Sequence, residues 1–266
     1  MANNYKDVSQ RWLEELKDTG YEYHIDEPRD CRQLGLSRVW KRILEEIRLP
    51  KAAKLRILEV GCGGGIQIAK LAAMGWECVG LDVSPEVLSR AEKYFEEIRE
   101  VCGVSLNIKI IAGDFYDIDR SELGESFDLV FNFGVIEHIL DDSARLKFLK
   151  KKYDLTRENG YIISMVPNGS HPLREKMKRA KLGGYNIPEI DYNHDLMQNE
   201  FETLGAKQIT ILPHNLFAYL LMEREYIITD YLRKLFYLTM QIAPQVIFSR
   251  DFCFRHAGSL IGIARK

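Results

Sequence analysis

Residues 57–65, Ile57-Leu58-Glu59-Val60-Gly61-Cys62-Gly63-Gly64-Gly65, carry the clearest pattern in this chain of 266 residues. A short apolar run passes directly into glycines and then into an amphipathic segment, which indicates a buried strand, a turn and a helix. Glycine permits positive φ and lets backbone N–H groups approach a ligand closely. The order therefore favours binding of a nucleotide or a related compound, while a turn that only packs the strand against the helix remains an alternative.

Outward from this turn, short apolar runs alternate with longer amphipathic segments, as is typical of a parallel sheet fed by crossover helices. We predict strands at 55–60, 77–81, 106–111, 127–132 and 160–166, and helices at 66–74, 85–101 and 141–155. Ser84 and Pro85 mark the start of the second helix, as N-cap and first helical residue. A helix at 194–204 and strands at 207–212 and 258–264 would close the sheet.

The segments outside this alternation are an N-terminal part and two insertions. The first fifty residues are predicted to be helical, and Pro50 ends a helix there. One face of that helix is buried: Val39, Trp40, Ile43, Leu44 and Ile47. The insertions are 167–193, with a basic stretch ending at Gly183-Gly184, and 213–254, which is mainly helical. We expect one domain, 1–266, with a cofactor-binding core at 51–166 and insertions that cap the substrate. For 213–254, a helix pair packed on the sheet or a homodimer contact is an equally good interpretation.

The composition restricts the classes of binding partner and of cellular compartment that are expected for this chain. Lys and Arg total 37 and Asp and Glu total 39, a net charge of -2, so no large positive field exists to hold a nucleic acid. The five cysteines are scattered without a C-x-x-C pair, which predicts neither a zinc site nor a disulfide framework and favours a reducing cytoplasm. The N-terminus lacks the apolar core of a secretion signal, and no apolar stretch approaches the roughly 20 residues of a transmembrane span.

Two acids follow the next two predicted strands. Asp82 comes roughly twenty residues after the glycines, where a carboxylate can accept hydrogen bonds from both hydroxyls of a ribose. Its alternative role is to cap the helix that starts at Pro85. Asp114 could accept from an adenine amino group while Phe115 or Val83 covers a face of the ring. An Asp-stabilised turn with Phe115 in the core is the other interpretation.

Together these residues resemble the class I S-adenosylmethionine-dependent methyltransferases over roughly residues 55–166. Glu59, the G-x-G-x-G at Gly61, Gly63 and Gly65, Asp82, and Asp114-Phe115 all stand where that family places them. Residues 127–138, Phe-Asp-Leu-Val-Phe-Asn-Phe-Gly-Val-Ile-Glu-His, are similar to the family's fourth strand and following loop. Residues 134–138 are also similar to the subgroup that methylates small biosynthetic intermediates, including quinone precursors.

The resemblance implies an α/β, Rossmann-like sheet of seven mostly parallel strands, with an antiparallel last strand and the cofactor S-adenosylmethionine across the carboxyl edge of the first four strands. The turn from Gly61 through Cys62 and Gly63 to Gly65 would meet the methionine part, and Glu59 its amino group. Asp82 would hold the ribose. Further contacts are implied for the adenine ring at Val83, Asp114 and Phe115, and for the methionine side at Asn132 and Phe133.

His138 is the candidate catalytic residue for transfer of a methyl group to a small-molecule acceptor. If the acceptor is a hydroxyl or thiol, a base must remove its proton, and the ordinary pKa of histidine lies near neutrality. A neutral amine or a carbanion needs no such base, and His138 would then only hydrogen-bond the backbone. No spacing typical of metal ligands is found. A nicotinamide-dependent oxidoreductase is an alternative, weakened because Ile66 interrupts G-x-G-x-x-G, and a non-catalytic S-adenosylmethionine-binding module is another.

Overall fold

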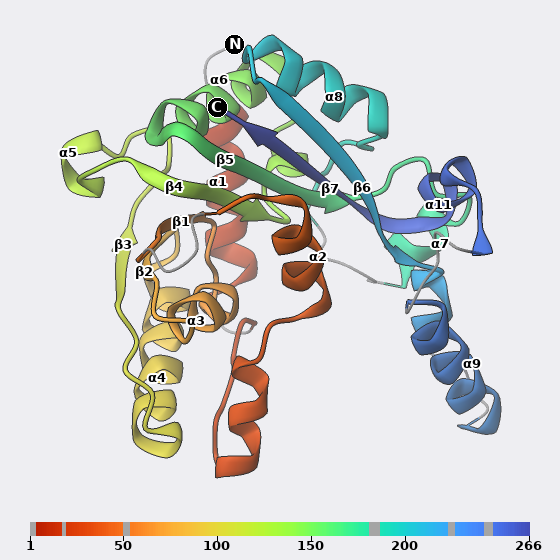
Figure 1. Cartoon of the computed structure of the whole chain (residues 1–266), viewed down its shortest axis with the longest axis horizontal. Helices are drawn as coiled ribbons and strands as arrows, with labels where there is room; N and C mark the ends of the chain where they lie inside the picture. Colours follow the sequence, from red (N-terminus) through yellow and green to blue (C-terminus); the bar gives the residue numbers. More distant parts are fainter. Residues whose placement is uncertain (1–3, 18–19, 50–53, 181–186, 223–226, 242–246) are drawn as a thin grey trace.

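Seven strands form one sheet in the order β3-β2-β1-β4-β5-β7-β6 (Figure 1). The computed structural model describes residues 4–17, 20–49, 54–180, 187–222, 227–241 and 247–266. The strands are β1 Arg56–Val60, β2 Glu77–Asp82, β3 Ile108–Ala112, β4 Phe127–Phe133, β5 Thr156–Pro167, β6 Gln208–Leu216 and β7 Ala257–Arg265. Within the described residues, only β7 runs antiparallel to its neighbours, β5 and β6, while the other neighbouring pairs are parallel. The predicted fold class is confirmed.

The helices follow the predicted alternation closely. They are α1 Asn4–Glu15, α2 Arg38–Glu46, α3 Ile66–Ala72, α4 Pro85–Cys102, α5 Arg120–Leu123, α6 Asp142–Leu155, α7 Arg174–Arg179, α8 His194–Thr203, α9 Ile227–Met240 and α11 Arg250–His256, with 3-10 helices η1 Pro28–Leu34, η2 Ile136–His138 and η3 Ala218–Leu221. Ser84 caps α4 as predicted, since its hydroxyl accepts from the Val87 amide at 3.3 Å. The α2 helix ends at Glu46, and the predicted terminator Pro50 lies outside the described residues.

Two hydrophobic clusters cover the two faces of the sheet. On one face, α2, α3 and α4 bury residues such as Trp40, Ile68 and Phe95 in one cluster with residues of β1, β2 and β4. On the other, α6 and α8 bury residues such as Phe148 and Phe201. Each such side chain contributes about 1.5–3 kcal/mol relative to leaving it in water. The resulting three-layer body holds the carboxyl ends of the strands in fixed positions.

The strand order reverses at β1. The crossover after β1 leads to β2 on one side, and β4 pairs with β1 on the other. In open α/β sheets, such a reversal leaves a crevice beyond the carboxyl ends of the strands, where ligands bind. This is the edge at which the glycine turn, Asp82 and Asp114 were predicted to meet.

One long-range link contradicts the sequence prediction. Cys31 of η1 and Cys102 at the end of α4 form a disulfide, with their Cα atoms 5.7 Å apart. The two cysteines are 71 residues apart, so no short sequence motif links them. They meet because η1 packs against α4. The prediction that cysteine usage indicates no disulfide is therefore wrong, and it no longer supports a reducing compartment. Cys62, Cys78 and Cys253 are buried thiols.

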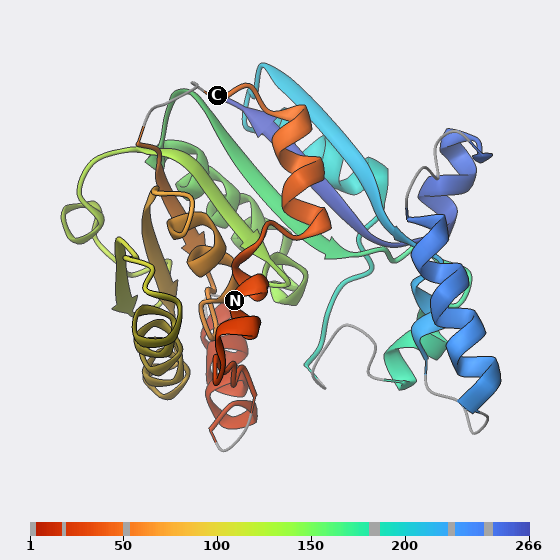
Figure 2. The same cartoon turned by 60° about the horizontal axis from the view of Figure 1, so that its bottom comes forward.

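Three helices from the two insertions, α7, α9 and α11, lie at the β6 and β7 side of the molecule (Figures 1 and 2). The first insertion contributes α7, although the end of its basic stretch at Gly183-Gly184 lies outside the described residues. The second begins within β6 and continues through η3, α9 and α11. Figure 2 shows α9 at the margin of the molecule, beyond the ends of β6 and β7. Among the described residues, no helix combines the length and apolar character required to cross a bilayer.

Candidate active site

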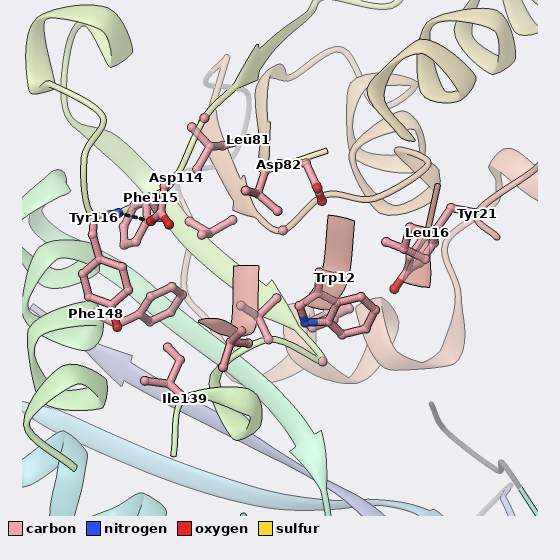
Figure 3. Close-up of a pocket in the computed structure, with 18 residues that line it drawn as sticks. Trp12, Leu16, Tyr21, Leu81, Asp82, Asp114, Phe115, Tyr116, Ile139 and Phe148 are labelled. Atoms are coloured by element: carbon pink, nitrogen blue, oxygen red, sulfur yellow. Dashed lines mark hydrogen bonds between the residues drawn. The ribbon is translucent and has the colours of Figure 1, made fainter. Parts of the chain in front are cut away.

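A pocket opens at the carboxyl edge of β1, β2 and β4, where the strand order reverses (Figure 3). Its walls come from the ends of these strands, from the loop after β3, and from α1 and α6. The lining residues are Val8, Trp12, Leu16, Tyr21, Val60, Gly61, Leu81, Asp82, Val83, Gly113, Asp114, Phe115, Tyr116, Phe133, Gly134, Val135, Ile139 and Phe148. Six of them are residues for which the sequence predicts a cofactor contact: Gly61, Asp82, Val83, Asp114, Phe115 and Phe133.

Gly61 is the residue of the glycine turn that lines the pocket. It has a φ of 73°, and a Cβ atom added there would lie 2.5 Å from the Val135 side chain. A side chain at this position would therefore both strain the backbone and collide with the opposite wall. Glycine is needed here because two strand ends approach each other across the mouth of the pocket.

The later turn residues pack against protein instead of lining the pocket. A Cβ atom at Gly63 would lie 3.0 Å from the Tyr21 ring, and one at Gly65 would collide with the Phe95 ring. The Cys62 side chain is buried, with its sulfur close to Gly80. Cys62, Gly63 and Gly65 thus shape the turn, and their predicted contact with methionine stays a prediction.

Asp82 lines the pocket while holding the glycine turn. Its carboxylate accepts hydrogen bonds from the amides of Gly63 at 2.9 Å and Ser84 at 3.0 Å. Burial raises the pKa of the carboxyl group, and the backbone hydrogen bonds oppose that shift. Asp82 holds the turn instead of capping α4, whose N-cap is Ser84. The two backbone bonds leave further lone pairs of the two oxygens for a ligand, and the ribose contact stays a prediction.

Glu59 lies below the turn and is not among the lining residues. Its side chain is buried, and its Oε2 atom has no hydrogen-bond partner. Burial raises the pKa of this carboxyl well above its usual range, and the nearby Asp82 adds to the shift. An unpartnered buried acceptor beside the turn fits the ammonium-binding role predicted for Glu59, which would be met through water or a small movement.

Asp114 and Phe115 lie together at one end of the pocket, as predicted (Figure 3). The Asp114 carboxylate accepts from the Tyr116 amide at 2.9 Å, so the Asp-stabilised turn also exists. The Phe115 ring is buried and meets Phe148 edge to face, with ring centroids 4.9 Å apart. Together with Val83, these residues form an apolar slot with an acid at its rim, which suits a flat heteroaromatic ring.

Phe133 and Asn132 at the end of β4 point into different environments. Phe133 lines the pocket and packs against Trp40, with the ring centroids 5.4 Å apart. Asn132 is fully buried outside the lining, where its Oδ1 atom accepts from Lys152 Nζ at 2.6 Å and Ser164 Oγ at 2.9 Å. Successive strand residues alternate between faces, so the two side chains cannot share one wall. A ligand contact through the Asn132 backbone stays a prediction.

The N-terminal segment forms a wall that sequence reasoning missed. Val8, Trp12 and Leu16 line the pocket from α1 and the residue after it, and Tyr21 follows. Their spacing of four residues is an amphipathic signal that could have been found, although it does not reveal what the apolar face covers. We call residues 8–17 and 20–31 the N-terminal cover.

One face of α4 holds the N-terminal cover in place. The Arg90 guanidinium donates to the carbonyls of Leu16 at 3.0 Å, Lys17 at 3.0 Å and Gly20 at 2.9 Å. Further along α4, Glu97 accepts from the Ile25 amide at 3.0 Å. A cation at the carboxyl end of α1 satisfies carbonyls that the helix leaves unpaired.

His138 sits in η2, next to the pocket but not in its lining. Its ring meets that of Trp12 edge to face, with centroids 5.1 Å apart. The Nδ1 atom lies 3.0 Å from the Pro188 carbonyl oxygen, so Nδ1–H donates and Nε2 carries the lone pair. Burial lowers the pKa of the ring, which keeps it neutral at neutral pH. The first insertion thus fixes the tautomer that a base needs.

Glu137, His138 and Glu189 form a group that could hold a metal ion. One ligand atom of each lies within 4.8 Å of the others. Glu189 comes from the first insertion, 51 residues after His138, so spacing in the sequence could not reveal this group. Glu189 is also paired with Arg174, which would compete with a cation. Burial raises the pKa of Glu137 to about 8, and its Oε2 atom has no partner.

A reversed strand order with a glycine turn and acids at the carboxyl edge defines a Rossmann-like protein that binds a nucleoside-containing cofactor. A family profile described as a methyltransferase domain matches residues 32–202, and the chain belongs to that family. The resemblance to class I S-adenosylmethionine-dependent methyltransferases is confirmed, with S-adenosylmethionine as cofactor. A nicotinamide-dependent oxidoreductase is not favoured.

Relatives and solved structures agree with this family. The ubiquinone biosynthesis O-methyltransferase of Mesorhizobium japonicum is 27% identical over 175 residues, covering 54% of this chain and 66% of that protein. The one of Rhizobium etli is 35% identical over 98 residues, covering 35% and 36%. The matches thus span between about a third and two thirds of these relatives.

The solved structures are similar in fold. An S-adenosylmethionine-dependent methyltransferase from Archaeoglobus fulgidus has a TM-score of 0.58 at 16% identity, over 85% of this chain and 90% of that one. Magnesium protoporphyrin IX methyltransferase from Synechocystis, solved with bound SAH, has a TM-score of 0.52 at 14% identity, over 99% and 95%.

Proposed function

We propose that this chain transfers the methyl group of S-adenosylmethionine to a hydroxyl oxygen of a small, partly apolar acceptor. One observation carries the proposal. Gly61, Asp82 and Asp114, from the ends of three strands, converge on one pocket whose opposite wall, Trp12, contacts His138. The cofactor fits the residues present: a buried carboxylate for ribose, an acid-rimmed apolar slot for adenine, and the unpartnered Oε2 atom of Glu59 for an ammonium group.

The reaction asks the protein for alignment, water exclusion and removal of one proton. When bound, S-adenosylmethionine supplies an electrophilic methyl group on a sulfonium, which an acceptor takes by in-line displacement. The apolar walls at Trp12, Phe133 and Val135 exclude water and orient an acceptor ring or chain. His138 Nε2 takes the proton of the acceptor hydroxyl, while the Pro188 carbonyl holds Nδ1–H and stabilises the imidazolium that forms.

Oxygen is proposed as the methylated atom for two reasons. The buried, neutral His138 is suited to accept a proton, which a hydroxyl must lose and a neutral amine need not lose during transfer. The relatives from Mesorhizobium japonicum and Rhizobium etli are named ubiquinone biosynthesis O-methyltransferases. A hydroxylated aromatic acceptor is the corresponding proposal for this chain.

A second role for His138 follows from its neighbours. With Glu137 and Glu189, it could hold a divalent cation that binds the acceptor oxygen and lowers the pKa of its hydroxyl. Chelation separates the two roles. Turnover that persists in EDTA supports His138 as the base, and turnover lost in EDTA and restored by Mg²⁺ or Zn²⁺ supports the cation.

Labelled-methyl transfer tests the proposed function. The purified protein would be incubated with methyl-labelled S-adenosylmethionine and hydroxylated aromatics, with matched amines as the comparison. We expect label on the hydroxylated acceptors and a loss of transfer in His138→Ala. Binding of S-adenosylhomocysteine without transfer to any acceptor would instead identify a non-catalytic module, and tighter binding of NAD would contradict the cofactor assignment.

The remaining sequence predictions belong to this proposal. The substrate-cap role of the insertions gains support for 167–193, since Pro188 and Ile190 contact His138 and Glu137. A homodimer and a cytoplasmic location stay predictions. Trapping thiols with an alkylating agent in intact cells tests the location, since Cys31 and Cys102 would be reduced in a reducing compartment.

A further inference from the structure

The α9 helix turns a polar face toward the protein body. The Arg233 guanidinium donates to the Met222 carbonyl at 3.1 Å, the Tyr237 hydroxyl to Asn215 Oδ1 at 3.1 Å, and the Gln241 amide to the Leu216 carbonyl at 2.7 Å. These side chains recur every fourth residue and so lie on one side of the helix. Polar groups thus fix the orientation of α9 on β6 and η3.

The rest of the α9 surface is mostly apolar and exposed to solvent, although the Phe236 ring also contacts Phe217 of the protein body, with centroids 6.1 Å apart. The exposed apolar side chains retain between 46% and 69% of their surface: Tyr231, Leu232, Leu235, Phe236 and Leu238. Of the eight large exposed hydrophobic residues in the described chain, six lie between residues 231 and 247. This arrangement is the reverse of an ordinary surface helix, which turns its apolar side inward. We call these five residues the α9 face.

A second copy of the chain is a poor match for the α9 face. A helix of 14 residues is roughly 21 Å long and about 10 Å wide, so one side offers a strip of a few hundred Å². A stable interface buries about 800 Å² on each partner. A bilayer has no such requirement, because an amphipathic helix can lie in the headgroup region with its apolar side immersed. The aromatic Tyr231 and Phe236 suit that region, where apolar and wet surroundings meet.

The charge around the α9 face favours an anionic surface. The chain as a whole has a net charge of -2, yet α7, α9 and α11 together carry eight cationic and three acidic residues. These three helices lie near one another on the same side of the molecule (Figures 1 and 2). Some of the cations are paired, as Lys178 is with Asp191. Five of the eight are exposed, and one of these five, Lys234, also pairs with Asp230: Lys176, Arg179, Lys234, Arg250 and Arg255.

We propose that the α9 face docks this protein on the surface of an anionic lipid bilayer, with cations of α7 and α11 meeting the headgroups. Apolar immersion and electrostatic attraction act together in such peripheral binding, and either alone is weak. The docking would hold the protein beside acceptors that partition into the bilayer. It does not depend on the identity of the acceptor or on methyl transfer.

Co-sedimentation with vesicles tests the proposal without any activity measurement. The probes are vesicles of phosphatidylcholine alone and of phosphatidylcholine with phosphatidylglycerol. We expect binding to the mixed vesicles that weakens as salt rises. A triple variant that combines Tyr231→Gln, Leu232→Gln and Leu235→Gln should bind the mixed vesicles at least about tenfold more weakly than the wild type. Glutamine preserves the helix and removes the apolar surface. The control Met74→Gln, Leu140→Gln removes exposed apolar side chains elsewhere and should bind like the wild type.

A charge pair separates the electrostatic part. Lys176→Glu with Arg179→Glu should weaken binding to the mixed vesicles, while Lys41→Glu with Arg99→Glu, exposed residues on α2 and α4, makes the same charge change and should have a smaller effect. Circular dichroism of each variant verifies folding. Absence of binding by the wild type, or equal binding by the α9 variant, would overturn the proposal. A wild-type dimer in sedimentation equilibrium that the α9 variant abolishes would also overturn it and assign the face to a second copy.

Discussion

Replacement of Asp82 by alanine perturbs the cofactor pocket and the glycine turn at once. The carboxylate accepts from the Gly63 and Ser84 amides, and it faces the pocket where the ribose is proposed to lie. From the sequence alone, the substitution is expected to weaken cofactor binding while leaving the fold intact. The structure adds a cost to folding, because two buried amides lose their acceptor.

Both magnitudes follow from the hydrogen bonds involved. A hydrogen bond to a charged group contributes about 1.5–3 kcal/mol, so loss of the ribose contact should raise the Kd for S-adenosylhomocysteine by roughly 10- to 150-fold. Each amide left without an acceptor costs about 1–3 kcal/mol, so the free energy of unfolding should fall by about 2–6 kcal/mol. Water entering from the pocket would reduce the second figure.

Ser84→Ala is the matched control. It removes the N-cap of α4, next to Asp82, at a cost of about 1 kcal/mol of stability, but it leaves the carboxylate in place. Titration calorimetry with S-adenosylhomocysteine and urea unfolding of both variants separate the effects. An unchanged Kd in Asp82→Ala would show that the carboxylate only holds the turn. An equal loss in Ser84→Ala would show that turn geometry, and not the carboxylate, determines affinity.

Three further substitutions test other parts of the site. His138→Ala should lower kcat by about 10²–10⁴-fold and leave the affinity for the methyl donor unchanged. Wild-type turnover should decline with falling pH only below the usual histidine range, because burial lowers the pKa of the ring. An unchanged kcat in the variant, measured by labelled-methyl transfer, would remove His138 from the mechanism. Arg90→Ala should loosen the N-terminal cover and raise the Kd for S-adenosylhomocysteine roughly tenfold, which corresponds to about 1.4 kcal/mol. The control Arg99→Ala, at an exposed position of the same helix, should leave the Kd unchanged. Equal Kd values for the two variants would contradict the anchoring role of Arg90. Glu137→Gln should flatten the pH dependence of the free energy of unfolding, because the native state, with a Glu137 pKa of about 8, keeps a proton that the unfolded chain releases near 4.5. As pH rises between those two values, the wild type should lose about 1.4 kcal/mol of stability per pH unit more than the variant. Parallel plots of stability against pH for the two proteins would refute this.

Local patterns predicted the sheet and most of the cofactor side of the pocket. The turn at Gly61, the cap at Ser84 and the acids Asp82 and Asp114 are determined by residues near them in the chain, and strand alternation brings them to one edge. For each of the two acids, the sequence left a ligand role and a structural role as alternatives. Asp82 and Asp114 both line the pocket and hold turns, so the structural role of each does not exclude its predicted ligand role.

What the sequence did not reveal depends on contacts between distant segments. Trp12 becomes a wall because Arg90, more than seventy residues later, holds the end of α1. Glu189 reaches His138 through the first insertion, and Cys31 reaches Cys102 through the packing of η1 on α4. The aromatic richness of 213–254 was visible, but only the orientation of α9 shows that its apolar side faces outward.

A crystal structure with S-adenosylhomocysteine tests the central claim most directly. We predict electron density for the adenosyl group in the pocket, with the ribose hydroxyls within hydrogen-bond distance of Asp82 and the adenine ring between Val83 and Phe115. The sulfur should point toward the wall formed by Trp12, beside His138. Density at another site, or an empty pocket at saturating ligand, would contradict the account.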